Sequence, residues 1–349
     1  RNRNVFCAVR PPGHHAGYRG LLDGANSCGF CIFNNVAAGA LHALEEHQCE
    51  RVAIIDLDVH HGNGTEDIVR RYAHPSRLFF FSLHLYDKED PHHIQGHGAA
   101  GSDSTAIVPV KANPDLPIDA VTALVEDDAS PVTAAVASGS ATPQRRYEFY
   151  PGTGVKDDHI HNIVNVPLLP LWAKDDPVSA KVSQLSGREG YRQAIQQRLI
   201  PSLRAFNPTL ILLSIGFDAA AGDVGNTRQI PGEGTRMGID LLPEDFAWAT
   251  TEIMKIADIC CSGRLVSVLE GGYGEYAALN KPSAVAHVPT TRGAARQSAP
   301  APVAAVETEK QSLLNRNLLA RVAAAHVHRL VDPYGPSSHL SQTTAHPAK

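Results

Sequence analysis

The chain has 349 residues, enough for one large α/β domain with appended segments. Its formal net charge is -5 and it has no dense Lys/Arg tract, which argues against direct nucleic-acid binding. No apolar stretch approaches the roughly 20 residues that a membrane helix needs, so we expect no membrane association. The six cysteines are scattered along the chain, as is typical of reduced thiols in a protein of the nucleus or cytoplasm.

Apolar runs of strand length alternate with helical patterns along the sequence. The expected strands are 5–9, 52–59, 78–85, 209–215 and 265–269, and the expected helices are 30–46, 188–206 and 243–262. These strands are apolar on both faces, which is typical of parallel strands covered by helices. The sequence therefore predicts an α/β fold: an open, three-layer parallel β-sheet with helices on both faces and its active site at the C-terminal ends of the strands.

Two regions break this alternation. Residues 87–146 are rich in Gly, Ser, Ala, Pro and Thr, so we predict a low-complexity insertion there. Residues 281–349 have a similar composition, and we expect a largely disordered tail in which 313–330 forms one amphipathic helix. The predicted domain therefore covers residues 1–280, interrupted by the insertion.

One strand run ends in alternating ionisable side chains. Asp56, Asp58 and His60 alternate with Leu57 and Val59, directly after four apolar residues. Side chains at positions i, i+2 and i+4 of a strand point the same way. Three ionisable groups on one buried face are costly unless a cation binds them. The pattern therefore predicts a metal site.

Other strand ends add Asp218, the adjacent His14 and His15, and Tyr273. Two carboxylates and one imidazole leave an open coordination position on Zn²⁺, as in a catalytic site, and the same ligand types accept Fe²⁺. Two histidines that exchange protons and a tyrosine that stabilises an oxyanion then indicate amide or ester hydrolysis. Each residue taken singly also fits a simpler role: a solvated histidine pair, a helix cap at Asp218, and turn packing at Tyr273.

Seven motifs resemble the histone deacetylase family, which has the arginase–deacetylase fold, and specifically its class II-type members. In the family's order they are residues 10–17, 27–37, 55–65, 81–84, 149–154, 216–219 and 269–273. The resemblance implies zinc-dependent hydrolysis of the acetyl amide of N6-acetyl-lysine in histones or other proteins, with release of acetate.

The resemblance also implies a role for each matching residue. The implied zinc ligands are Asp58, His60 and Asp218. The implied catalytic residues are His15 as general base and acid, His14 beside it with Asp56 as its orienting carboxylate, Asn63 as the partner of the second histidine, and Tyr273. The implied walls of the acetyl-lysine tunnel are Gly29, Phe30 and Tyr150. The backbone of Asp56, Asp58 and His60, together with Ser82 and Leu83, matches a site for a monovalent cation, typically K⁺.

The sequence also departs from the family pattern. It lacks the segment that members carry before the motif at residues 10–17, including a rim Asp that grips the substrate backbone, so we expect an N-terminally truncated scaffold. The partners that the resemblance implies are an acetylated histone or other acetyl-lysine protein and a corepressor complex. Chromatin regulation, transcriptional repression and a location in the nucleus or cytoplasm follow as expectations.

Three alternatives compete with this function. An arginase-like site with two metals would need further ligands at positions 62 and 220, where the chain has Gly62 and Ala220. An acetylpolyamine or other small-amide deacetylase uses the same catalytic residues and stays open, because the contacts that select the substrate lie in the missing segment. A scaffold protein or an inactive fragment also stays open, although a scaffold is expected to lose site residues that are all present here.

Overall fold

The computed structural model describes residues 4–87, 149–173, 185–230, 234–276, 314–315 and 317–335. All of them belong to one compact unit of the chain, and residues 90–147 lie outside the described residues. The predicted insertion at 87–146, apart from Asp87, and most of the predicted tail therefore lie outside the described residues as well. None of the described helices is both long and apolar enough to cross a membrane.

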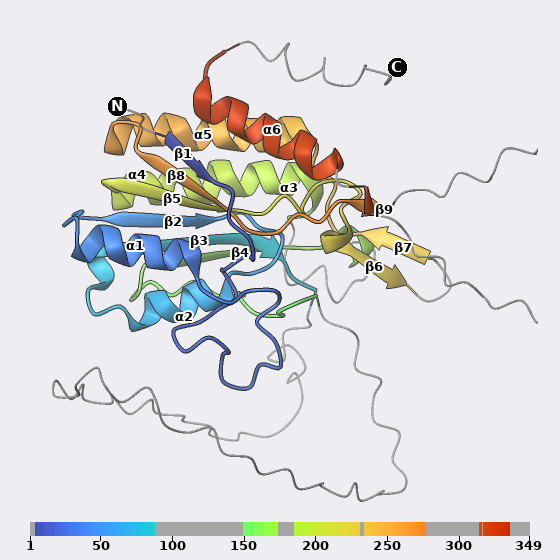
Figure 1. The fold of residues 1–349 in the computed structure, drawn as a ribbon, viewed down its shortest axis with the longest axis horizontal. Coiled ribbons are helices and arrows are strands. Elements are labelled where there is room, and N and C mark those ends of the chain that lie inside the picture. Colours follow the sequence, from blue (N-terminus) through green and yellow to red (C-terminus); the bar gives the residue numbers. More distant parts are fainter. Residues whose placement is uncertain are drawn as a thin grey trace, which may run out of the picture. The chain divides into compact units, whose positions relative to one another are not determined.

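Six parallel strands form the central sheet (Figure 1). In spatial order they are β1 (Asn4–Cys7), β8 (Leu265–Leu269), β5 (Leu210–Ile215), β2 (Val52–Asp56), β3 (Leu78–Leu85) and β4 (Ile163–Leu168). The five strands predicted from the sequence are all present, although β1 and β2 end earlier than expected. The sixth, β4, was missed. Because all six strands run parallel, their carboxyl ends meet at one edge of the sheet.

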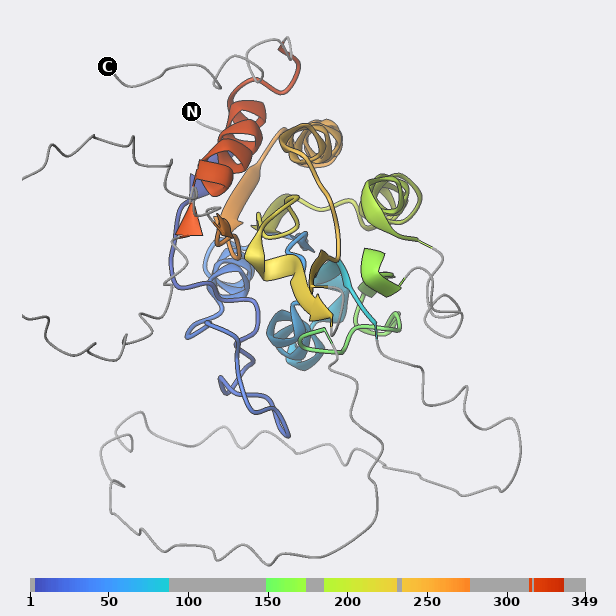
Figure 2. The same ribbon diagram turned by 90° about the vertical axis from the view of Figure 1, so that its right-hand side faces the viewer.

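Helices cover both faces of the sheet (Figure 2). Ile54 of β2 belongs to the core that includes side chains of α1 (Asn35–Glu45) and α2 (Asn63–Arg71). Its neighbour Ile55 belongs to the opposite core, with side chains from α6 (Asn317–Val331), described below, and from three other helices. These are α3 (Gly187–Ala194), α4 (Ile200–Phe206) and α5 (Pro243–Cys261). Successive strand residues point to opposite faces, so the predicted three-layer architecture is confirmed.

The expected helices differ from the observed ones mainly at their ends. The helix expected at 30–46 begins at residue 35, because the Asn34 side chain accepts a hydrogen bond from the Ala37 N–H (3.0 Å) and caps it. The helix expected at 188–206 is interrupted by a π-helical turn at Ile195–Leu199. The shorter elements are 3₁₀ turns at Pro75–Arg77, Leu171–Ala173 and Val224–Asn226, the hairpin of β6 (Thr227–Ile230) and β7 (Gly234–Met237), and the pair β9 (Glu275–Tyr276) and β10 (Leu314–Asn315).

The last helix, α6 (Asn317–Val331), packs against α5 and β1. Its Val322 and Leu330 are buried, and both nitrogens of its His326 ring contact hydroxyl groups. Nδ1 lies 2.7 Å from Oγ1 of Thr250 in α5, and Nε2 lies 2.8 Å from Oγ of Ser267 in β8. The helix was expected at 313–330, but in a tail beyond the domain end at residue 280. It belongs to the folded unit because its apolar face completes the core.

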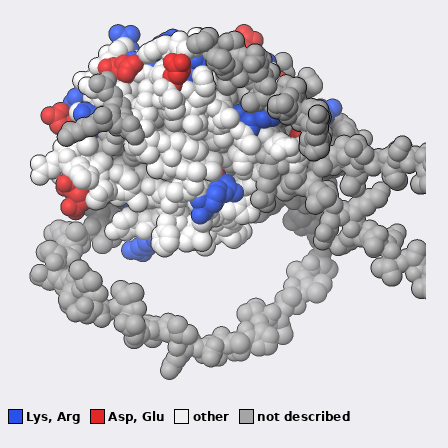
Figure 3. All heavy atoms as spheres, turned by 45° about the horizontal axis from the view of Figure 1, so that its top comes forward, with Lys and Arg blue, Asp and Glu red and all other residues white. Residues whose placement is uncertain are grey.

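Charged side chains are scattered over the face shown in Figure 3. Lysines and arginines do not gather there into a continuous basic surface among the described residues. Such a surface is what sequence-independent nucleic-acid binding needs. The absence of nucleic-acid binding stays a prediction from the net charge.

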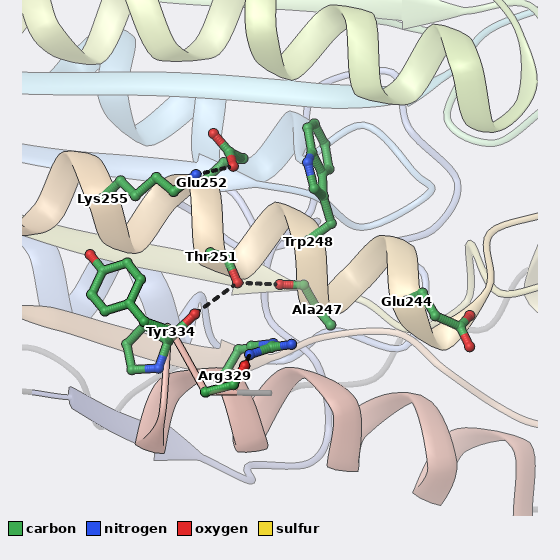
Figure 4. A pocket seen from close by; sticks show the side chains of 10 residues that line it. Glu244, Ala247, Trp248, Thr251, Glu252, Lys255, Arg329 and Tyr334 are labelled. Atoms are coloured by element: carbon green, nitrogen blue, oxygen red, sulfur yellow. Dashed lines mark hydrogen bonds and ion pairs between the residues drawn. The ribbon is translucent and has the colours of Figure 1, made fainter. Parts of the chain in front are cut away.

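A surface pocket lies between α5 and the end of α6 (Figure 4). Trp248 and Thr251 line it from α5, and Arg329 and Tyr334 line it from the other side. The hydroxyl of Thr251 lies 3.4 Å from the carbonyl oxygen of Pro333, which ties the segment after α6 to α5. None of the residues predicted to form the active site lines this pocket.

The buried His326 ring makes stability depend on pH. Burial lowers its pKa from 6.5 to about 3, so below about pH 6.5 the unfolded chain binds a proton that the folded chain does not. The free energy of unfolding then falls, as pH decreases toward 3, by about 1.4 kcal/mol per pH unit from this group. We expect His326→Gln to lose this share of the slope in urea unfolding between pH 6.5 and 5. If the free energy of unfolding changes equally with pH in the variant and the parent chain, His326 does not cause this pH dependence.

Candidate active site

The three predicted metal ligands converge at the carboxyl edge of the sheet. Asp58 and His60 follow β2 and Asp218 follows β5, and each offers a ligand atom within 4.8 Å of the others. His60 Nδ1 lies 3.0 Å from Asp58 Oδ1 and 3.1 Å from Asp218 Oδ2. Both carboxylates are buried. Two buried carboxylates directed at one imidazole nitrogen form a group that could hold a metal ion.

The convergence does not come from strand geometry alone. β2 ends at Asp56, so Asp58 and His60 lie in the bends that follow it, not in the strand as predicted. Backbone N–H groups hold this segment in place: Asp58 N donates to Asp56 Oδ1 (3.1 Å) and His60 N donates to Asp58 Oδ1 (2.9 Å). The carboxylates of Asp56 and Asp58 therefore fix the backbone of the segment that carries Asp58 and His60.

Backbone groups from neighbouring strand ends also fix the two carboxylates. Gly271 N donates to Asp58 Oδ2 (2.7 Å), and Val59 N donates to Asp218 Oδ1 (3.2 Å). A Cβ atom at Gly271 would overlap Asp218 Oδ2, so only glycine lets the backbone approach this closely. These contacts orient the carboxylates before any ion binds.

The electrostatics of the three groups are those of a cation site. Burial lowers the pKa of His60, but hydrogen bonds with Asp218 and Asp58 outweigh it and raise the pKa to about 9. Burial raises the pKa of Asp218, and the nearby Asp58 carboxylate raises it further. Without a metal ion the group therefore retains a proton, which a divalent cation displaces on binding. The residues fit such an ion in ligand type, number and charge.

The paired histidines differ in their partners. His14 Nδ1 lies 2.9 Å from Asp56 Oδ2, and His15 Nδ1 lies 2.9 Å from Asn63 Oδ1. The Gly64 N–H donates to the same Asn63 oxygen (3.1 Å), which identifies this atom as the acceptor. His15 therefore carries its proton on Nδ1, and its Nε2 offers a lone pair.

The two imidazoles also differ in charge. Burial lowers the pKa of His14, but the Asp58 and Asp56 carboxylates outweigh it and raise the pKa well above its ordinary value. Burial lowers the pKa of His15 well below its ordinary value, and the nearby His14 and His60 lower it further. Near neutral pH the pair therefore consists of a charged His14 and a neutral His15, which can accept a proton.

Tyr273 lies beside the ligand Asp218. A Cβ atom at Gly225 would lie 2.9 Å from the Tyr273 ring and 2.7 Å from Asp218 Cβ, so this glycine lets the two side chains approach each other. The Arg10 guanidinium lies 5.4 Å from the centre of the ring on its face. Burial and the carboxylates of Asp218 and Asp58 raise the pKa of Tyr273, so its hydroxyl stays protonated and can donate a hydrogen bond.

The predicted tunnel residues border the catalytic ones. The centre of the Phe30 ring lies 5.6 Å from that of Tyr273, and the centre of the Tyr150 ring lies 4.8 Å from that of His15. A Cβ atom at Gly29 would lie 2.7 Å from the His15 ring. Phe30 is 67% exposed, as expected of a residue at the mouth of a tunnel.

The predicted monovalent-cation residues lie on adjacent strands. Asp56 of β2 pairs with Ser82 of β3, and Leu83 follows Ser82 in the same strand. All three are buried, and Ser82 Oγ lies 2.9 Å from Nδ1 of His84. Adjacent strands bring these groups together, while the cation itself stays a prediction.

Three residues that support the candidate site were not predicted from the sequence. Glu270 is fully buried, and its carboxylate accepts hydrogen bonds from the N–H groups of Gly13 (2.7 Å) and His14 (3.1 Å) and from the Ser214 hydroxyl (2.7 Å). It ties the end of β8 to the histidine loop. An acidic residue directly after an apolar strand was the available signal, the same one that identified Asp56.

The other two missed residues are Asp223 and Phe149. Asp223 accepts hydrogen bonds from the N–H groups of Tyr273 (2.9 Å) and Gly274 (2.7 Å), and so holds the backbone that carries the tyrosine. The Phe149 ring stacks on the His60 ring, with centres 4.9 Å apart and planes 7° apart. No local pattern around Asp223 pointed to this contact.

Comparisons with known proteins agree with this geometry. The model of the histone deacetylase domain matches residues 1–138 and 140–288. The "Type-2 histone deacetylase 2" of Dictyostelium discoideum is 31% identical over 278 residues, which cover 77% of this chain and 11% of that protein. The "Histone deacetylase-like amidohydrolase" of Pseudomonas aeruginosa is 30% identical over 272 residues, covering 78% of this chain and 48% of that protein.

A solved structure described as the HDA15 HD domain covers 78% of this chain and 51% of that one, with 26% identity and a TM-score of 0.47. The chain spans less than half the length of either curated relative. The family match extends over most of the chain and includes all the residues that form the site. The parallel sheet with helices on both faces is the α/β fold that the family resemblance implied. The chain belongs to the histone deacetylase family.

Proposed function

We propose that this chain catalyses the zinc-dependent hydrolysis of the acetyl amide of N6-acetyl-lysine in histones or other proteins. The products are acetate and the free lysine amine. The observation that carries the proposal is the convergence of Asp58, His60 and Asp218 beside a histidine pair whose members have different partners, within the region that matches the family.

The ligand set favours zinc. A bound Zn²⁺ supplies an acidified water and polarises the substrate carbonyl. Two carboxylates and one imidazole nitrogen leave room for both, and the same set accepts Fe²⁺. Asp58, His60 and Asp218 would hold the ion.

The protein's own groups then move the protons. His15 Nε2 accepts a proton from the attacking water, because Asn63 holds the ring proton on Nδ1. The water oxygen bonds to the carbonyl carbon, and the Tyr273 hydroxyl donates to the oxyanion that develops. A histidine returns the proton to the lysine nitrogen as the carbon–nitrogen bond breaks. His14 is held by Asp56 and lies next to His15.

A monovalent cation beneath the zinc site is the second part of the proposal. His84 Nε2 lies 3.0 Å from the Gly154 carbonyl oxygen, which can only accept, so this nitrogen carries the ring proton. His84 Nδ1 then accepts the proton of the Ser82 hydroxyl, which leaves the Ser82 oxygen lone pairs available. These lone pairs and the carbonyl oxygens of Asp56, Asp58, His60 and Leu83 would provide the oxygen ligands that K⁺ prefers.

A small-amide deacetylase, such as one acting on acetylpolyamines, is the second candidate. The name of the Pseudomonas relative, an amidohydrolase, favours it. Phe30 and Tyr150 suit an alkyl stem that acetyl-lysine and acetylspermidine share, so the wall does not separate them. The ratio of kcat/KM on an acetyl-lysine peptide to that on acetylspermidine decides between the two. Zinc-loaded protein without turnover on either would favour an inactive fragment or a scaffold.

The biological setting remains part of the proposal. The names of the relatives suggest an acetylated histone or other acetyl-lysine protein as partner, and with it a chromatin regulator that represses transcription. We place such a protein in the nucleus or cytoplasm, in association with a corepressor complex. Co-purification of the full-length gene product from cell extract would test this setting.

Tyr273→Phe tests the oxyanion donor. Removal of this hydroxyl should lower kcat on an acetyl-lysine peptide on the order of 10²–10³-fold, as for other oxyanion donors. Zinc content should stay unchanged, because the hydroxyl is not among the ligand atoms. A variant with unaltered kcat would remove Tyr273 from the mechanism.

Asp218→Ala tests the metal site. The remaining pair of ligands should retain too little zinc to survive dialysis, as measured by elemental analysis. Asp157→Ala is the matched control, since that carboxylate pairs with Arg198 in an ion pair away from the ligands. Equal zinc content in both variants and the parent would show that the ion binds elsewhere.

Glu270→Ala tests the support of the histidine loop. Loss of the carboxylate leaves the buried N–H groups of Gly13 and His14 without their acceptor, so the histidine pair should shift. We expect kcat to fall about 10²-fold with zinc retained, because misplaced catalytic groups cost rate on this scale. Glu270→Gln keeps one acceptor oxygen and should restore much of the activity. If both variants match the parent, Glu270 has no positioning role.

A further inference from the structure

A second cluster of buried polar side chains lies behind the candidate site. It consists of His61 after β2, Glu66 in α2, His84 in β3 and Asn165 in β4, and no step of the proposed reaction uses it. His61, His84 and Asn165 are at most 3% exposed. The centres of the His61 and His84 rings lie 4.5 Å apart. The burial of so many polar groups beside the site indicates that this cluster has a function of its own.

The two histidines contact consecutive residues of one loop. His61 Nδ1 lies 2.8 Å from Thr153 Oγ1, and His84 Nε2 lies 3.0 Å from the Gly154 carbonyl oxygen. Gly154 has a φ of +85°, and a Cβ atom there would lie 2.6 Å from both rings. The loop therefore comes as close to the two imidazoles as a backbone can.

The rest of the cluster fixes the orientation of His61. Its Nε2 lies 2.9 Å from Glu66 Oε2, which also accepts from Asn165 Nδ2 (2.8 Å). The Arg70 guanidinium donates to the other Glu66 oxygen (2.8 Å). Because the carboxylate accepts, His61 carries a proton on Nε2, and its Nδ1 shares a hydrogen bond with the Thr153 hydroxyl.

The loop that is gripped in this way carries the aromatic wall of the site. Phe149 stacks on His60, and Tyr150 lies against His15. At its other end, the Phe149 N–H donates to Asp87 Oδ1 (2.7 Å). Residues 149–154 are thus anchored at Asp87 and at the two histidines, with the wall between the anchors.

We propose that His61, His84 and Glu66 act as a loop clamp that positions residues 149–154 and thereby sets the affinity for the acylated side chain. These are positioning residues, because they contact the loop and not the reacting atoms. The effect on substrate affinity rests on the proposed function, whereas the hold on the loop does not. A wall that contacts substrate and transition state alike affects KM more than kcat.

Thr153→Val is the sharpest test, because it removes the hydroxyl at nearly constant shape and leaves both histidines in place. We expect amide hydrogen exchange in residues 149–154 to rise on the order of 5-fold, the factor that corresponds to the loss of one hydrogen bond. KM for an acetyl-lysine peptide should rise by a similar factor, with kcat within about 2-fold and zinc content unchanged.

Two further variants serve as controls. Thr153→Ser keeps the hydroxyl and should restore both the exchange rate and KM. Thr209→Val removes a threonine hydroxyl that donates to the Arg51 carbonyl oxygen (2.9 Å) just before β5, at the other edge of the sheet. Thr209→Val should leave the amide hydrogen exchange of residues 149–154 and the KM for the acetyl-lysine peptide at the parent values.

Unchanged exchange in Thr153→Val would overturn the clamp, and faster exchange with unchanged KM would overturn its role in substrate affinity. A parent chain that binds zinc but hydrolyses no acetyl-lysine peptide would instead overturn the proposed function. Hydrogen exchange does not depend on turnover, so it would still decide whether the clamp exists.

Discussion

Two carboxylates buried against one imidazole are the interaction on which the whole site depends. Asp58 and Asp218 lie at the carboxyl edge of a parallel sheet, where water cannot screen their charges. Removal of such charges from water costs several kcal/mol per ion unless a cation and hydrogen-bond donors compensate. The donors are already present as backbone N–H groups of Val59 and Gly271. The structure therefore orients these side chains so that either a retained proton or a bound metal ion can compensate their charge.

The groups around this centre are supported by strand ends far apart in sequence. Glu270, after β8, holds the histidine loop that follows β1, while Asp223 holds the backbone of Tyr273. Asn63, at the start of α2, selects the tautomer of His15. The histidine loop, His15 and the backbone of Tyr273 are thus each held by a residue from another part of the chain. This arrangement requires the parallel sheet, because only parallel strands bring all their carboxyl ends to one edge.

Adjacent residues after β2 serve the metal site and the aromatic wall. His60 turns toward Asp58 and Asp218, and the next residue, His61, turns toward Thr153. The ring of Phe149 stacks on His60 from the same loop that contains Thr153. Metal ligand and wall are therefore linked through a few short contacts.

Patterns within single strands were readable from the sequence, and so were the parallel sheet and its helical layers. The alternation of Asp56, Asp58 and His60 after an apolar run was enough to indicate a candidate metal site, although the strand ends at Asp56 and the other two residues follow it. The ends of other strand runs added Asp218 and Tyr273, and the family resemblance then implied their roles. The sequence could not reveal Glu270 as the support of the histidine loop, because its contact with His14 spans 256 residues and depends on which strand ends become neighbours. Such pairings are decided by packing, so only the tertiary structure determined them.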